Sequence, residues 1–284
     1  MDPPEHTRHR AMVEQDFTAE KAKSMRPGIQ QIVDKVIDEM TAQPQPVDLI
    51  VSFSMPVPTL VIYQMLGVPY EDHEFLENCN SIRTNGSATS AESAAASKDL
   101  MDYLGSLVDK KEKEPSDDII SRLVKEQVQT GKLTRDELVA MAFLLLLRQD
   151  PSLIKGAVDE ILRYLTGSQF ATRRVAIEDV EVGGQTIKKG EGVWALNASA
   201  NEDGSVFPDP TRFDIHRRPN PHLAFGDGIH ICIAEHLARV EVEIAIATLI
   251  LRFPNLQLAV SDDNVQYVTD PARDFGVKTL PVKW

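Results

Sequence analysis

Hydrophobic residues in the first half of the chain recur at three- and four-residue steps, the spacing of helices that bury one face. The clearest stripe consists of Ile29, Ile32, Val33, Val36, Ile37 and Met40. Pro44 closes this helix, and Pro56 stands near the start of another, which ends at Gly67. The pattern therefore predicts a helical first half.

Polar signals mark where further helices begin. Asp118 and its neighbours precede one helix, and the segment 134–137 is a capping box ahead of the apolar run 138–147. The stretch 81–97 is polar and rich in Ala and Ser, so we expect it to join two helices. A further helix is predicted over 159–165.

The second half of the chain changes to shorter elements. Strand-like segments lie at 173–176, 180–182 and 185–187. The pair Gly183–Gly184 supplies a tight turn between the last two. A meander rich in Pro and Asp follows over 207–221, then a long helix over about 232–251 and short strands from Leu256. We therefore expect a mainly α fold with a minor β part.

Charge and composition narrow the function classes. The formal net charge of -13 argues against nucleic acid or an anionic membrane surface as the main partner. The apolar run 138–147 is too short to span a bilayer, and the N-terminus has no apolar signal region. The only cysteines, Cys79 and Cys232, lie far apart, which fits a reducing compartment. We therefore expect a cytoplasmic protein that binds neither membrane nor nucleic acid.

The segment 225–234, FGDGIHICIA, carries the strongest chemical signal. Two glycines flank one residue, so the backbone can turn tightly and come close to a flat group. Cys232 is expected at the first turn of the following helix, where unpaired N–H groups and the helix dipole stabilise a thiolate. A lone cysteine is more often a small buried hydrophobic residue, as we expect for Cys79. The surrounding loop favours a ligand role for Cys232 instead.

This loop resembles the heme-binding loop of the cytochrome P450 family. The resemblance implies the P450 fold, a bound heme b (iron protoporphyrin IX) and Cys232 as the thiolate ligand of the iron. A thiolate ligand pushes electron density onto heme iron and favours O–O cleavage. The resemblance also assigns Phe225, Gly226 and Gly228 to heme binding, and His230 to a heme propionate.

A second motif of this family lies upstream of the cysteine loop. Glu160 and Arg163 form E-x-x-R, with both charges on one helix face. Such a pair alone is usually a solvated surface pair. The family motif implies instead a buried ion network with the arginine of a P-x-R-F meander, which is Arg212 here. Its role would be structural, holding the cysteine loop against the core.

Three further cationic side chains are implied in heme binding. Arg174 begins the family's first strand segment, where an arginine pairs with a propionate. His6 and Arg10 stand four residues apart, so on a helix they face the same way. Alone they indicate a solvated basic helix end, but the pattern D-P-P-x-H-x-x-x-R implies propionate binding.

Within the family the chain is most similar to the fungal nitric oxide reductases. The similar segments are MDPPEH at the start, 82–87, 117–121, 126–128 and 232–238, which includes Ala234. This branch reduces NO to nitrous oxide with electrons taken directly from NADH or NADPH. Ser168 and Asp274 occupy positions implicated in its proton delivery. Without the resemblance they would be a loop serine and a surface acid.

Relative to this family, two parts of a P450 domain are missing. The chain begins after a substantial N-terminal part, and an upstream mitochondrial targeting segment is compatible with that. Leu147 also runs directly into Arg148, where the family has a long central helix over the distal heme face and a second helix. Pro151 prevents simple continuation of the apolar run. We therefore expect one incomplete domain over 1–284, with a helical part at 1–147 and the motif-bearing part at 148–284.

Several alternatives remain open from the sequence. A monooxygenase of the same fold would act on a small organic substrate and would need a redox partner. A non-catalytic remnant would follow if loss of the central helix prevents heme binding; an incomplete gene model or a skipped exon would explain that loss. A cysteine hydrolase is disfavoured, because His230 and His236 flank Cys232 without an evident oxyanion hole or orienting acid.

Overall fold

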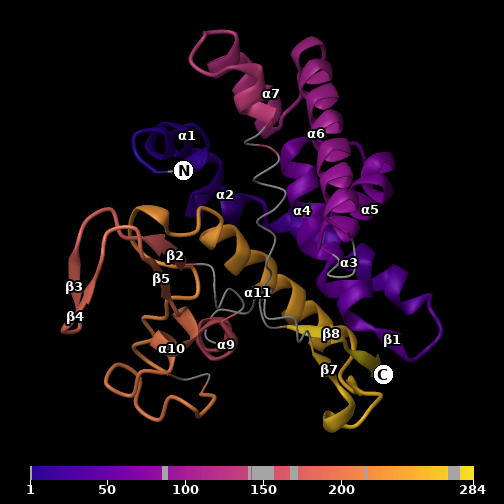
Figure 1. Ribbon diagram of the computed structural model, residues 1–284. Coiled ribbons are helices and arrows are strands. Elements are labelled where there is room, and N and C mark those ends of the chain that lie inside the picture. Colours follow the sequence, from indigo (N-terminus) through magenta and orange to yellow (C-terminus); the bar gives the residue numbers. More distant parts are fainter. Residues whose placement is uncertain are drawn as a thin grey trace. The chain divides into compact units, whose positions relative to one another are not determined.

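The computed structural model describes residues 2–84, 89–139, 142, 157–166, 172–214, 217–267 and 276–284. The chain divides into two compact units. Figure 1 shows the chain coloured from its N-terminus to its C-terminus. The first unit comprises 1–43 and 51–151, and the second comprises 44–50 and 152–284. The main division thus lies four residues after Leu147. Among the described residues, no helix combines the length and the apolar composition that a membrane crossing requires.

Helices build the first unit. They are α1 (Glu5–Val13), α2 (Ala19–Ser24), α3 (Arg26–Thr41), α4 (Pro56–Leu66), α5 (His73–Thr84), α6 (Ser90–Lys113) and α7 (Ile119–Leu123). Helix α3 confirms the first predicted stripe, because Ile29, Val33, Val36, Ile37 and Met40 are all buried. The predicted capping box at 134–137 is also present, since the Glu137 N–H donates to Thr134 Oγ1 over 3.2 Å.

One prediction for this unit was wrong. The stretch 81–97 is not mainly a connection, because α5 continues to Thr84 and α6 already begins at Ser90. Thr89 caps α6 together with Glu92, whose N–H donates to Thr89 Oγ1 over 3.2 Å. Alanine has the highest helix propensity, so the Ala-rich part of this stretch extends the helix rather than interrupting it.

Helix α4 ends where three elements of the first unit meet. Gly67 adopts a left-handed conformation with φ of 71° and caps α4. The carboxylate of Asp118 lies beside Gly67, accepts a hydrogen bond from the Ser121 N–H over 2.8 Å, and pairs with Lys111 Nζ over 2.7 Å. This carboxylate therefore connects the end of α4 with α6 and α7.

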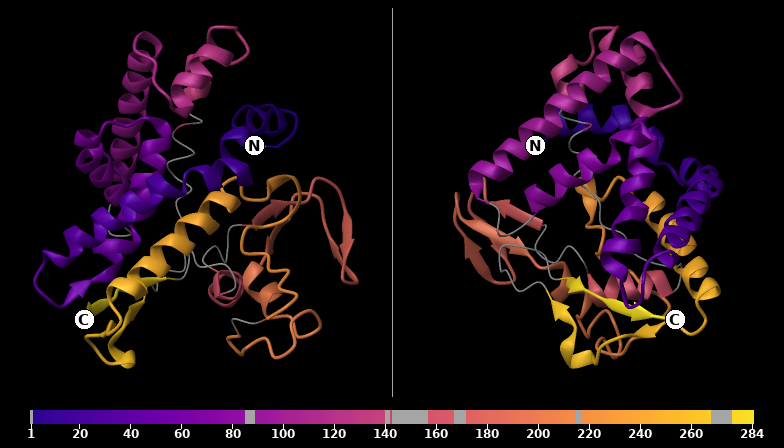
Figure 2. Two further views of the ribbon diagram at one scale, coloured as in Figure 1. Left: turned by 180° about the vertical axis from the view of Figure 1, so that it is seen from behind. Right: turned by 90° about the vertical axis from the view of Figure 1, so that its right-hand side faces the viewer.

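In the part of the second unit that the structure describes, short antiparallel strands accompany three α-helices. The helices are α9 (Ala157–Leu165), α10 (Asn197–Asn201) and α11 (Glu235–Arg252). Strand β2 (Thr172–Val175) pairs with β5 (Gly192–Ala195), β3 (Val180–Val182) with β4 (Gln185–Ile187), and β7 (Gln266–Tyr267) with β8 (Val277–Thr279). Figure 2 shows these elements from two further sides. The three strands predicted between 173 and 187 are thereby confirmed.

A three-stranded sheet joins an early segment to the far end of the chain. Its order is β1 (Val47–Asp48), β9 (Pro281–Lys283) and β6 (Gln257–Leu258). Val47 stands opposite Val282, and the Leu280 N–H donates to Asp48 Oδ1 over 3.0 Å. This pairing explains why 44–50 belongs to the second unit.

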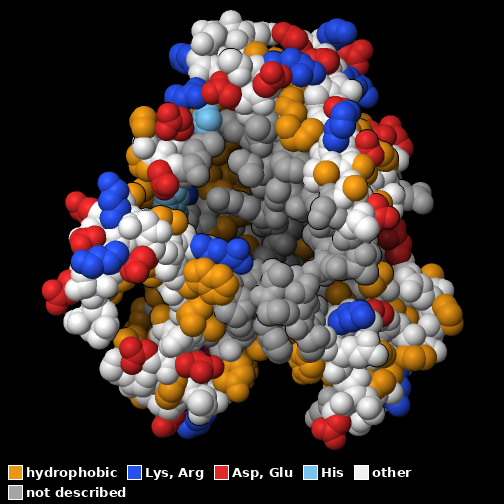
Figure 3. Space-filling model, viewed as in Figure 1, with side chains coloured by type: hydrophobic (Ala, Val, Ile, Leu, Met, Phe, Trp, Pro, Cys, Tyr) orange, Lys and Arg blue, Asp and Glu red, His pale blue; other side chains and the backbone are white. Residues whose placement is uncertain are grey.

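Hydrophobic side chains also lie at the surface, interspersed with charged ones (Figure 3). Several belong to the strand region of the second unit, where Val175 is 64% exposed, Ile177 84% and Trp194 55%. Apolar side chains of this strand region are thus exposed to solvent.

Candidate functional site

The cysteine loop is closed by backbone hydrogen bonds. The Cys232 N–H donates to the Phe225 carbonyl over 2.8 Å, and the Gly226 N–H donates to the Leu223 carbonyl over 2.9 Å. Gly226 and Gly228 both adopt left-handed conformations, with φ of 73° and 70°. Only glycine adopts this conformation at little cost, so the two glycines make the fold of the loop possible.

The loop has an open face. A Cβ atom added at Gly226 or Gly228 would meet nothing within 4 Å. The Cys232 thiol is half-buried, and Ile229 is 62% exposed. A soft sulfur donor in an apolar loop with bare glycine backbone suits a flat, iron-containing group such as heme. The residues present therefore fit this cofactor.

Helix α11 begins later than the sequence predicted. Its first residue is Glu235, with Ala234 as the N-cap, so Cys232 lies in the turn before the helix rather than in its first turn. The short helical turn Gly228–His230 occupies the preceding residues, and the Glu235 N–H donates to the Cys232 carbonyl over 3.3 Å. The positive end of the 18-residue helix still follows the cysteine directly, which favours a thiolate.

A buried ion network lies behind the loop. Arg163 donates from Nε and Nη2 to the two carboxylate oxygens of Glu160, each over 2.8 Å, and neither side chain is exposed. Arg217 Nε lies 3.0 Å from Glu160 Oε2, and the Asp214 N–H donates to Glu160 Oε1 over 2.8 Å. Burial acts to raise the pKa of Glu160, but the hydrogen bonds from Arg163, Asp214 and Arg217 outweigh it and hold the pKa at about 2.

The third cation of this network differs from the prediction. The side chain of Arg212 is exposed, and it is the carbonyl oxygen of Arg212 that accepts hydrogen bonds, from Arg163 Nη2 over 3.3 Å and Arg217 Nη2 over 3.0 Å. The guanidinium beside Glu160 belongs to Arg217 instead. The meander thus turns the backbone of Arg212 inward and its side chain outward. The only sequence signal for this cation is the Arg-Arg-Pro run at 217–219.

A buried asparagine also went unnoticed in the sequence. Asn201 is fully buried at the end of α10. Its side chain donates to Thr166 Oγ1 over 2.9 Å and accepts from the Leu223 N–H over 2.7 Å, and its carbonyl accepts from Arg163 Nη1 over 2.8 Å. Nothing in the local sequence marks this asparagine, because its partners are 22 to 38 residues away.

A charged cluster packs against the aromatic residue of the loop. The Arg239 guanidinium lies 5.2 Å from the centre of the Phe225 ring and is paired with Asp159 and, over 3.1 Å, with Glu235. His222 lies on the same guanidinium, with Nε2 3.3 Å from Arg239 Nη2. Burial and the Arg239 charge lower the pKa of His222. This cluster connects α9, α11 and the loop.

The remaining predicted heme residues are placed on separate elements. Arg174 lies on β2 opposite Val193, and its side chain is exposed. His230 ends the short turn before Cys232 and is half-buried. His6 and Arg10 lie on α1 of the first unit, and both are half-buried. Their roles toward propionates remain predictions. Ser168 and Asp274 lie outside the described residues.

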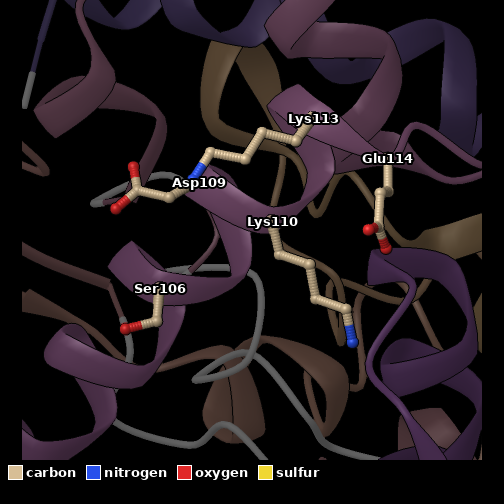
Figure 4. A pocket seen from close by; sticks show the side chains of 5 residues that line it. All are labelled: Ser106, Asp109, Lys110, Lys113 and Glu114. Carbon is tan, nitrogen blue, oxygen red and sulfur yellow. The ribbon is translucent and has the colours of Figure 1, made fainter.

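A surface hollow of about 310 Å³ is unrelated to these residues. It is lined by Ser106, Asp109, Lys110, Lys113 and Glu114, at the C-terminal end of α6. Figure 4 shows these side chains spread around the helix rather than converging on one point. The hollow is therefore a charged surface feature of the first unit and not the candidate site.

Comparison with known proteins supports the family resemblance. A family model described as Cytochrome P450 matches residues 146–283. "Cytochrome P450 55A3" from Fusarium lichenicola is 42% identical over 315 residues, covering all of this chain and 77% of that protein. "Vitamin D3 dihydroxylase" from Streptomyces griseolus is 40% identical, covering all of this chain and 76% of that protein. The crystal structure of GfsF, a protein from Streptomyces halstedii, superposes with a TM-score of 0.92 at 40% identity, covering all of this chain and 80% of that one.

Proposed function

The chain belongs to the cytochrome P450 family, and from this premise we propose that it is a heme-thiolate monooxygenase in which Cys232 binds the iron. The observation that carries the proposal is the geometry of the cysteine loop. The Cys232 N–H closes the loop onto Phe225, while two left-handed glycines leave the loop face bare. This arrangement presents one soft donor beside a surface on which a flat cofactor can lie.

The chain's own residues would hold the cofactor at several points. Cys232 would supply the thiolate ligand of the iron, and the bare backbone at Gly226 and Gly228 would leave room for the flat cofactor. The family resemblance assigns His230 and Arg174 to the heme propionates, and likewise His6 and Arg10 on α1. Bound heme would supply the redox chemistry. The Glu160–Arg163–Arg217 network fixes the meander and, through Asn201, the start of the loop.

We propose a small organic molecule as the substrate. The supporting observation is the printed name of a relative, a vitamin D3 dihydroxylase, whose sequence matches the whole of this chain. Such a reaction needs electrons from NADH or NADPH, delivered through a partner reductase or ferredoxin. The absence of a disulfide framework fits the cytoplasm as its compartment.

Reduction of NO to nitrous oxide is the second candidate. The sequence segments shared with the fungal nitric oxide reductases favour it, including Ala234 two places after the cysteine. In this reading electrons come directly from NADH or NADPH without a partner protein. Ser168 and Asp274 would then deliver protons.

A non-catalytic remnant is the third candidate. The match to the Fusarium protein extends over 315 residues, whereas this chain has 284, so the relative carries residues within the matched region that have no counterpart here. The expected absence of a central helix after Leu147 would account for this difference. A transcript read across the Leu147 and Arg148 codons tests that explanation, and a longer form would identify the chain as an incomplete product.

The proposal is tested by expressing the full chain with heme available and recording the difference spectrum of its reduced, CO-bound form. A thiolate-type Soret band that is lost in Cys232→Ser and kept in Cys79→Ser supports heme ligation by Cys232. No band, or one typical of a neutral ligand, contradicts the proposal and favours a remnant. NADH oxidation with NO and no partner protein would then separate NO reduction from partner-dependent hydroxylation.

A further inference from the structure

Every polar group of the Asn201 side chain and its carbonyl serves a different segment of the second unit. The side-chain Nδ2 donates to Thr166 Oγ1, the side-chain Oδ1 accepts from the Leu223 N–H, and the carbonyl accepts from Arg163. The residue is completely buried. A buried amide that is hydrogen-bonded at both its nitrogen and its oxygen is costly to disturb, because any group left unpaired stays away from water.

The acceptor side of this amide leads to the cysteine. The Leu223 N–H that bonds to Asn201 belongs to a turn closed by the Gly226 N–H on the Leu223 carbonyl, over 2.9 Å. The carbonyl of Phe225, the residue before Gly226, accepts a hydrogen bond from the Cys232 N–H over 2.8 Å. A short relay of backbone hydrogen bonds thus joins Asn201 to the residue that carries the thiol.

The donor side of the amide leads to the end of α9. Thr166 directly follows this helix with φ of 36°, a conformation that residues other than glycine rarely adopt. Its hydroxyl already donates to the Arg163 carbonyl over 2.8 Å, so it accepts from Asn201. Asn201 therefore holds the residue that directly follows α9.

We propose that Asn201 is a positioning residue that holds the cysteine loop against the end of α9, an inference that rests on the proposed function. The role requires a donor and an acceptor at the end of one short side chain. Asparagine alone offers both at this length, since aspartate offers acceptors only and leucine offers neither. The contact to α9 and the contact to the loop are thereby coupled through a single planar amide.

Variants of the full-length chain separate the two contacts. Asn201→Leu removes both side-chain hydrogen bonds, and Asn201→Asp keeps an acceptor for Leu223. Thr166→Val removes the acceptor of Nδ2 and leaves the Leu223 contact intact, although it also removes the hydrogen bonds from the Thr166 hydroxyl to the Leu162 and Arg163 carbonyls. Asn264→Leu is the matched control, because Asn264 also donates from Nδ2 to a hydroxyl, Ser261 Oγ over 2.8 Å, but at an exposed position.

Amide hydrogen exchange is the first measurement, and it does not depend on bound heme. We expect exchange at Leu223 and Gly226 to accelerate at least about tenfold in Asn201→Leu, and to stay near the native rate in Asn201→Asp, Thr166→Val and Asn264→Leu. Equal exchange in Asn201→Leu and Asn264→Leu would overturn the proposal. If Asn201→Leu does not fold, acceleration in Asn201→Asp as large as that of a global unfolding would also overturn it.

The second measurement uses the heme-loaded chain. We expect Asn201→Leu to lose much of its thiolate-type band in the reduced, CO-bound spectrum, and Asn201→Asp to restore it. Thr166→Val should keep the band. A band of native intensity in Asn201→Leu would contradict the positioning role. If the native chain shows no thiolate band, the proposed function fails, while the exchange measurement still decides the role of Asn201.

Discussion

Arg217 Nε lies 3.0 Å from Glu160 Oε2, in a place where neither carboxylate oxygen is exposed to water. Arg217 also donates to the carbonyl oxygens of Pro208 over 2.6 Å and Arg212 over 3.0 Å. The Arg217 guanidinium therefore neutralises the buried Glu160 carboxylate and also binds backbone carbonyls of the irregular meander. Removing it should have a larger effect than removing any exposed arginine of the same segment.

We expect Arg217→Leu to lower the free energy of unfolding by about 3–5 kcal/mol, because it leaves a buried carboxylate and several carbonyls short of partners. Arg212→Leu is the matched control and should change it by less than about 0.5 kcal/mol, since that side chain is exposed. Denaturant unfolding of both variants measures the difference. A larger loss in Arg212→Leu would restore the original prediction that Arg212 is the network cation.

The same network should make stability depend on acidity. The pKa of Glu160 is held at about 2, below its ordinary value of 4.5. A depressed carboxyl pKa contributes stability above pH 4.5 that is lost as pH falls toward 2. The loss should be on the order of 3 kcal/mol. Unfolding measured across this range should show the slope in the native chain and a weaker slope in Glu160→Gln, and an equal slope in both would contradict the assignment.

Glu241 should have the opposite effect. It lies among the buried residues of α11, and burial raises its pKa from 4.5 to about 8. Because the folded state then holds the proton more tightly than the unfolded state, stability is present below pH 4.5 and lost as pH rises to about 8. Glu241→Gln should remove this loss, on the order of 5 kcal/mol, and should be more stable than the native chain at alkaline pH. Glu243→Gln on the same helix is the control, and a native pH dependence in Glu241→Gln would refute the expectation.

Two glycines of the first unit should differ in their tolerance of alanine. Gly67 and Gly131 have nearly equal φ values, 71° and 73°, so an alanine is strained at both. A Cβ at Gly67 would also collide with the Asp118 carboxylate, whereas a Cβ at Gly131 would meet nothing within 4 Å. We expect Gly131→Ala to cost about 1 kcal/mol and Gly67→Ala about 3 kcal/mol. Equal thermal stabilities of the two variants would show that Asp118 moves aside at little cost.

Local patterns predicted the local elements well. Helix α3, the end of α4 at Gly67 and the hairpin of β3 and β4 follow from spacing and turn residues that lie within a few positions of one another. The formation of these three elements depends little on the rest of the chain. The family itself was predictable for a similar reason, because the cysteine loop is one continuous segment.

Elements decided by distant partners could not be predicted in this way. The inward turn of the Arg212 backbone depends on Glu160 and Arg163, which lie about 50 residues earlier. The two-residue strand β1 exists only because β9 pairs with it. The local sequence around Asn201 gives no indication that its side chain is buried, because its hydrogen-bond partners are distant in sequence. The start of α11 was misplaced for a local reason, since the turn at Gly228–His230 and the following residues precede the helix.

The pairing of β1 with β9 also bears on how the chain folds during synthesis. Asp48 and Leu280, which are hydrogen-bonded across this sheet, are 232 residues apart. At translation rates of roughly 5–20 residues per second, β1 leaves the ribosome on the order of ten seconds before its partner exists. During that time the segment 44–50 has no strand partner, whereas the helices of the first unit depend on contacts closer in sequence. The sheet of β1, β9 and β6 should therefore form after those helices.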